Sequence, residues 1–126
     1  MANYVDGFVI VIPKNNAEAY KKMAIEGRDS WMKHGALGYY ECRGESLAPN
    51  EMGGDKTRTF TEMTGASSEE DVWFSFIIFK SKEHRDAVNA LVMEEMSKQA
   101  KDQKEMDMPF DMKRMSYGGF QAEVEG

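Results

Sequence analysis

Two segments of this chain, residues 4–12 and 72–79, are apolar at almost every position, and no other feature constrains the fold as strongly. Successive side chains of a β-strand point to opposite faces of its sheet, so a strand with this pattern needs cover on both faces. Both segments are therefore expected to be central strands. Their apolar residues are Val5, Phe8, Val9, Ile10, Val11 and Ile12 in the first and Val72, Trp73, Phe74, Phe76, Ile77, Ile78 and Phe79 in the second.

Each apolar segment is followed by residues with the periodicity of an amphipathic helix. Asn15 or Asn16 is expected to cap the first helix, with Asn15 and Glu18 at the spacing of a capping box, and Gly35 to end it. Ser81 is expected to cap the second helix. The recurring residues are Tyr20, Met23, Gly27, Trp31 and His34 in the first helix and Ala87, Val88, Leu91, Val92 and Met96 in the second.

The remaining strands are expected to be more polar, at residues 38–44 and 114–124, and the β-branched residues of segment 57–64 are expected to extend the sheet. The order β-α-β-β-α-β predicts an α+β fold of the ferredoxin-like type. Its four-stranded antiparallel sheet would have the first and third strands in the centre. The chain has 126 residues, which suits a single domain spanning residues 1–126.

Two helices can cover only one face of such a sheet. Monomeric proteins rarely leave a large apolar patch of the other face in water. A second copy of the sheet is the simplest cover, which predicts a homodimer. The uncovered residues would be either Trp73, Ile77 and Phe79 or Phe74, Phe76 and Ile78.

The charge of the chain bears on its partners. It has 16 Lys and Arg against 22 Asp and Glu, a net charge of −6 at pH 7. This balance argues against nucleic acid and anionic membranes as partners. The aromatic residues of segment 72–79 resemble the third strand of RNA-recognition domains, but Val72 and Trp73 stand where that pattern has a basic residue and a glycine. RNA binding is therefore not expected.

A cytoplasmic location is expected. The longest apolar stretch, Phe8–Ile12, is too short to cross a bilayer, and residues 1–6 lack the basic region and apolar core of a signal peptide. The single cysteine, Cys42, excludes an internal disulfide and fits a reducing compartment. Strand alternation points Cys42 and Arg43 to opposite faces, which favours a buried, unreactive thiol.

Three polar residues are candidates for acid/base or orienting roles in catalysis: Asp6, His34 and Tyr117. Asp6 is a charge within an apolar strand, either a hydrogen-bonded carboxylate or a buried acid. His34 is either a base or haem ligand or a helix-terminal histidine favoured by the helix dipole. Trp31 and Phe110 are the candidate walls of a ligand pocket.

Glycines interrupt two strands that are expected to be neighbours. Gly7 lies in the first and Gly118 in the last, with Phe8 expected roughly opposite Gly118. A glycine in a strand marks either a bend that closes a barrel or the close approach of a ligand, so Gly7 and Gly118 are also candidate ligand contacts.

No metal or cofactor is expected, because the two histidines and one cysteine lack the spacing of a zinc site. Thioethers suit soft metals such as Cu(I), but a methionine cluster before the last strand is expected to provide adaptable packing instead. The cluster consists of Met106, Met108, Met112 and Met115.

Several short segments carry a resemblance to a known family: Tyr4–Phe8, Gly35–Leu37, Glu41–Cys42, Ser81–Glu83, Arg85–Asp86, Met108–Asp111, Lys113–Met115 and Tyr117–Phe120. With them the chain resembles, over nearly its whole length, a YbaA-like bacterial family of unknown function. The resemblance implies the dimeric α/β-barrel superfamily, in which two ferredoxin-like subunits pack sheet against sheet and each keeps a pocket between its sheet and helices. The family offers no established catalytic residues.

Two functions agree with these features. The first is a dimeric module that binds a small molecule without catalysis. The second is a cofactor-independent oxygenase or isomerase that acts on a small aromatic or enolisable compound, and it requires at least two of Asp6, His34 and Tyr117 to face one cavity. An RNA-associated role, a label that some family members carry, gains no support from the acidic composition.

Overall fold

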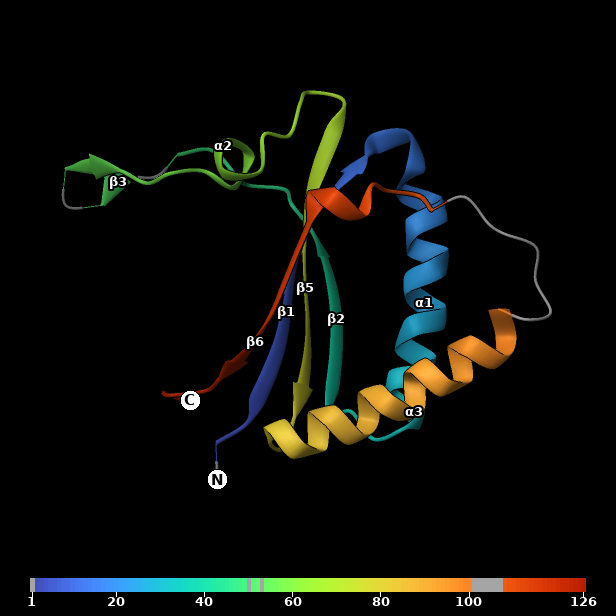
Figure 1. Cartoon of the computed structure of the whole chain (residues 1–126). Coiled ribbons are helices and arrows are strands. Elements are labelled where there is room, and N and C mark those ends of the chain that lie inside the picture. Colours follow the sequence, from blue (N-terminus) through green and yellow to red (C-terminus); the bar gives the residue numbers. More distant parts are fainter. Residues whose placement is uncertain (1, 50, 53, 101–107) are drawn as a thin grey trace.

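Four long strands form one antiparallel sheet in the computed structural model, which describes residues 2–49, 51–52, 54–100 and 108–126. The sheet has the order β2-β5-β1-β6, so the two apolar segments are its central strands, as predicted. Two long helices, α1 and α3, lie together on one side of the sheet (Figure 1). The four strands are β1 (Tyr4–Pro13), β2 (Gly38–Arg43), β5 (Glu70–Phe79) and β6 (Met115–Gln121).

The helices decide which apolar residues are covered. α1 (Ala17–Lys33) packs on Trp73 through Tyr20, and α3 (Lys82–Ala100) packs on Phe79 through Val88 and Val92. The set Trp73, Ile77 and Phe79 therefore belongs to the core. The uncovered surface, here called the open face, includes Val5, Gly7, Val9, Phe74, Phe76, Ile78, Gly118 and Phe120.

The register between β1 and β6 differs by one residue from the expected one. Gly7 lies opposite Gly118, and Phe8 lies opposite Tyr117. A short 3-10 turn, η2 (Met112–Arg114), takes up Arg114, so β6 begins at Met115. Two residues without side chains thus face each other on the open face.

The helix starts match the expected caps only in part. Ser81 caps α3, because its Oγ accepts a hydrogen bond from the His84 backbone N–H at 3.1 Å. Asn16 occupies the N-cap of α1, but its side chain makes no cap and instead donates to the Pro109 carbonyl oxygen at 2.9 Å. A preceding 3-10 turn, η1 (Lys14–Asn16), leads into this helix, so the predicted capping box with Asn15 does not form. α1 ends before Gly35, whose φ of 113° suits glycine.

The expectation of a strand at residues 57–64 is wrong. A short helix, α2 (Phe60–Thr64), occupies the end of this segment. Thr59 and Glu62 form a reciprocal capping box that starts it, and this local signal overrides the β-branched composition. The two short strands β3 (Glu51–Met52) and β4 (Asp55–Lys56) precede it, and in Figure 1 they and α2 project to the left, away from α1 and α3.

In the part of the chain that the structure describes, every helix is either too short or too polar to cross a membrane.

Candidate functional site

A cavity of about 460 Å³ lies between the sheet and the two long helices. Its walls are mostly apolar and rich in methionine, a side chain that adapts its shape to irregular gaps. Phe110, one of the predicted pocket walls, lines this cavity, and its ring meets that of Tyr20 edge-on with centroids 5.6 Å apart. The methionines are Met23, Met93, Met96, Met108, Met112 and Met115; Met106 of the predicted cluster lies outside the described residues.

One carboxylate, that of Glu41, lies in the wall of this cavity, here called the Glu41 pocket. Tyr20 donates a hydrogen bond to Glu41 Oε2 at 2.7 Å, and Tyr39 donates to Oε1 at 2.8 Å. The hydroxyl of Ser75 also donates to Oε2. Three hydroxyl groups therefore hold a single carboxylate in place.

Three elements bring these groups together. Tyr39 and Glu41 are two positions apart on β2 and so point to the same face, and Ser75 on β5 lies directly opposite Glu41. Tyr20 reaches the cluster from α1, where Gly27 leaves room for the Tyr39 hydroxyl: a Cβ atom at Gly27 would lie 3.1 Å from it. The glycine thus allows the helix to approach the strand.

The two tyrosines are hydrogen-bond donors rather than acids at neutral pH. Burial raises the pKa of Tyr20 above its usual range, and the hydrogen bond to Glu41 raises it further. Burial also raises the pKa of Tyr39, with the charge of Glu41 as the second cause. Both phenols therefore keep their protons and direct them at the carboxylate.

A smaller cavity of about 260 Å³ adjoins the Glu41 pocket and shares Phe8, Trp31, Met93 and Met115 with it. Here it is called the Asp6 pocket. Asp6 and Tyr117 both line it.

An arginine joins Asp6 and Tyr117 in the Asp6 pocket. Arg85 Nη1 lies 2.7 Å from Asp6 Oδ1 and donates to the Tyr117 hydroxyl at 2.9 Å. Asn89 donates to the other Asp6 oxygen at 3.4 Å, and Trp31 Nε1 donates to Asn89 Oδ1 at 2.9 Å. Asp6 is 1% exposed, so it is a buried carboxylate with hydrogen-bonding partners on both oxygens.

The structure separates the predicted site residues into four places, and Phe110 lines the Glu41 pocket. Asp6, Tyr117 and Trp31 meet at the Asp6 pocket, which satisfies the requirement that two of the polar candidates face one cavity. His34 is the C-cap of α1 and lines neither cavity, and its Nε2 lies 2.6 Å from Glu95 Oε2 on α3. Gly7 and Gly118 lie on the open face.

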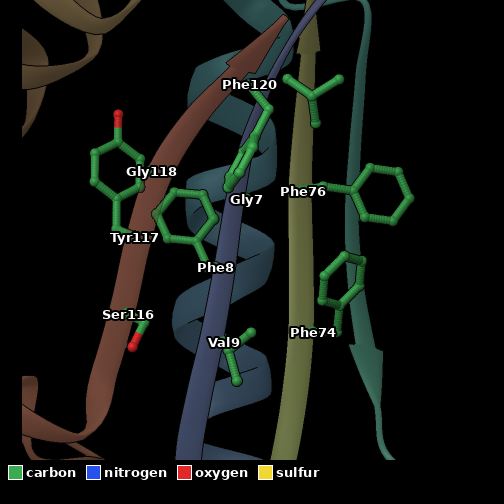
Figure 2. A pocket seen from close by; sticks show the side chains of 10 residues that line it. Gly7, Phe8, Val9, Phe74, Phe76, Ser116, Tyr117, Gly118 and Phe120 are labelled. Carbon is green, nitrogen blue, oxygen red and sulfur yellow. The ribbon is translucent and has the colours of Figure 1, made fainter. Parts of the chain in front are cut away.

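The open face holds a shallow groove of about 620 Å³ above the two opposed glycines (Figure 2). The ring of Phe120 leans over Gly7, and a Cβ atom there would lie 3.3 Å from it. Phe74 is 46% exposed and Phe120 is 62% exposed, which leaves large aromatic surfaces uncovered.

Cys42 is exposed, so the expectation of a buried thiol is wrong. Alternation along β2 sends Tyr39 and Glu41 toward the helices. It sends Cys42 to the open face, opposite Phe74. The direction of Cys42 away from Arg43 was predicted correctly, but the face it reaches has no cover.

The tyrosine-bound Glu41 was not among the residues predicted for the site. Glu41 was interpreted as an ordinary charge on an edge strand, and Tyr20 as part of the apolar face of a helix. The alternation of Tyr39 and Glu41 was the available signal, since it puts a tyrosine and a carboxylate on the same face. Among the described residues, three or more His, Cys, Asp or Glu side chains do not gather anywhere in a way suited to a metal ion.

Comparisons with known proteins agree with the YbaA-like resemblance. Residues 3–112 match a family described as "Protein of unknown function (DUF1428)". The chain is 37% identical over 122 residues, 97% of each chain, to the uncharacterized protein YbaA of Escherichia coli strain K12, and equally similar to the relative from Shigella flexneri. The chain belongs to the DUF1428 family.

Proposed function

We propose that this protein is a homodimeric module that binds a small molecule in the Glu41 pocket. One observation carries the proposal: an apolar cavity of about 460 Å³ encloses a single carboxylate that three hydroxyl groups orient. Small-molecule sites typically combine an apolar lining of this size with a few well-placed polar groups. The methionines around it suit a ligand whose shape the pocket must accommodate.

The open face supports the homodimer. Its groove is lined by apolar residues and glycines, with Ser116 and Tyr117 as the polar exceptions. A second copy that packs its own open face here would bury Phe74 and Phe120 in a two-fold contact. The strand order β2-β5-β1-β6 and the family resemblance support a ferredoxin-like fold and membership of the dimeric α/β-barrel superfamily. A cytoplasmic location completes the proposal, supported by the exposed thiol of Cys42.

A cofactor-independent oxygenase or isomerase is the second candidate. Asp6 and Tyr117 favour it, because they share a cavity that adjoins the Glu41 pocket. The ion pair with Arg85 favours the non-catalytic function, since it occupies the carboxylate that a general base would need.

The pocket is tested with Nile red, an uncharged dye that fluoresces in apolar sites. Met23 of α1 lines the Glu41 pocket, whereas Met32 of the same helix is 43% exposed and lies outside it. We expect Met23→Trp to fill the cavity and weaken dye binding about tenfold or more, a loss of about 1.4 kcal/mol. Met32→Trp is the matched control and should bind like the wild type.

Equal binding of the dye by the two variants would contradict the proposal, because it would place the dye outside the Glu41 pocket. Circular dichroism of each variant shows whether the fold is intact.

A further inference from the structure

We infer that the Glu41 pocket takes a cation, namely a small aromatic or apolar compound with a protonated amine. The inference rests on the proposed function, that this pocket binds a small molecule, and adds the charge and chemical class of the ligand. Four observations support it.

The first observation is the charge of the walls. Among the described residues that line the Glu41 pocket, Glu41 is the charged side chain, and lysine, arginine and histidine are lacking. The adjoining Asp6 pocket also holds a carboxylate, but Arg85 lies 2.7 Å from it, so among the described lining residues Glu41 is the carboxylate without a cation beside it. An anionic ligand would be placed near negative charge in an apolar site, which disfavours it.

The second observation is a vacant acceptor position. A carboxylate offers about four acceptor positions, two on each oxygen. Among the described residues, Glu41 Oε2 accepts from both Tyr20 and Ser75, whereas Oε1 accepts from Tyr39 alone. One position on Oε1 is therefore left for a ligand donor, and an ammonium N–H makes the stronger, charge-assisted bond there.

The third observation is that Glu41 has no cationic partner within the described part of the chain. Ion pairs there involve other carboxylates, and the nearby Arg28 is paired with its neighbour Asp29 at 3.0 Å. A half-buried charge held by neutral hydroxyls alone is stabilised further by a counter-ion. The ligand would supply that counter-ion.

The fourth observation is the set of aromatic rings in the pocket wall. Tyr20, Tyr39 and Trp31 all line the cavity, and the rings of Trp31 and Tyr39 lie 6.0 Å apart between centroids. The faces of such rings attract cations, most strongly where water is excluded. An amine near Glu41 would gain from both the carboxylate and the rings.

The test uses three probes of nearly the same size that differ in charge: 2-phenylethylamine, 2-phenylethanol and phenylacetate. Their affinities are measured by calorimetry near pH 7. We expect the amine to bind about tenfold or more tightly than phenylacetate, with the alcohol between them. Glu41→Gln should remove the preference for the amine, and Glu45→Gln, the same charge change at an exposed neighbour, should keep it.

Three results would overturn the inference: phenylacetate binding as tightly as the amine, no saturable amine binding within its solubility, or an unchanged amine preference in Glu41→Gln. If Glu41→Gln fails to fold, the affinities of the wild type for 2-phenylethylamine and phenylacetate test the inference on their own. The Nile red experiment keeps the two proposals apart. Dye binding that Met23→Trp abolishes, together with no amine preference, refutes the charge class alone.

Discussion

Removing the Arg85 side chain should destabilise the fold substantially. In Arg85→Met the buried Asp6 carboxylate, 1% exposed, loses the cation that lies 2.7 Å away and keeps neutral partners such as Asn89, at 3.4 Å. Breaking a buried ion pair on one side costs 3 to 5 kcal/mol, and because Arg85 is 13% exposed we take the low end, about 3 kcal/mol. Arg58→Met, at an exposed arginine, is the control and should change stability by less than about 0.5 kcal/mol.

The assay is urea unfolding followed by tryptophan fluorescence, at one protein concentration because the stability of the proposed dimer would depend on concentration. A double-mutant cycle with Asp6→Asn separates the ion pair from simple loss of packing. Asp6→Asn alone should cost less, about 1 to 2 kcal/mol, since Arg85 keeps Asp86 at 2.8 Å. The double variant should be about 2 kcal/mol more stable than the sum of the single changes. Additive effects, or a cost for Arg85→Met within 1 kcal/mol of the control, would refute this reasoning.

Two further predictions concern the packing of the core and the dependence of the free energy of unfolding on acidic pH. Phe79→Ala removes a ring that is fully buried between β5 and α3 and should cost about 4 kcal/mol in urea unfolding; a cost below about 2 kcal/mol would contradict the packing described. The hydrogen bond from His34 holds the pKa of Glu95 below its usual 4.5, with Lys33 as the second cause. A carboxyl group whose pKa is lowered by folding stabilises the fold above pH 4.5, and this contribution is lost as the pH falls through the lowered value. The free energy of unfolding of Glu95→Gln should therefore decrease less than that of the wild type between about pH 7 and about pH 3. The same decrease in Glu95→Gln and in the wild type would contradict this role of Glu95.

The fold was largely predictable because its main signals are local. The two-faced apolarity of segments 4–12 and 72–79 identified the central strands, and the apolar periodicity identified both long helices. The strand expected at residues 57–64 rested on β-branched composition alone, whereas the capping box of Thr59 and Glu62 starts a helix there. Phe8 lies opposite Tyr117 rather than Gly118, and this one-residue difference was not predictable because the apolar pattern specifies the register of a glycine-rich strand only weakly.

The candidate site was predictable only in part, because its residues meet through tertiary packing. Asp6 and Tyr117 share a pocket, but the arginine that joins them lies on α3, far away in the sequence. Glu41 appears in the sequence as one charge among many. Its importance depends on Tyr20 from α1 and Ser75 from β5, whose approach is set by the helix and sheet packing rather than by a motif.

Native mass spectrometry in the presence of 2-phenylethylamine detects the dimer and its ligand in one spectrum. A homodimer with an amine in each Glu41 pocket should give a species of two chains, each of 14.3 kDa, with up to one amine per chain. The Met23→Trp variant should keep the two-chain species and lose the amine. Single chains at micromolar concentration, or equal amine loading of the wild type and Met23→Trp, would contradict it.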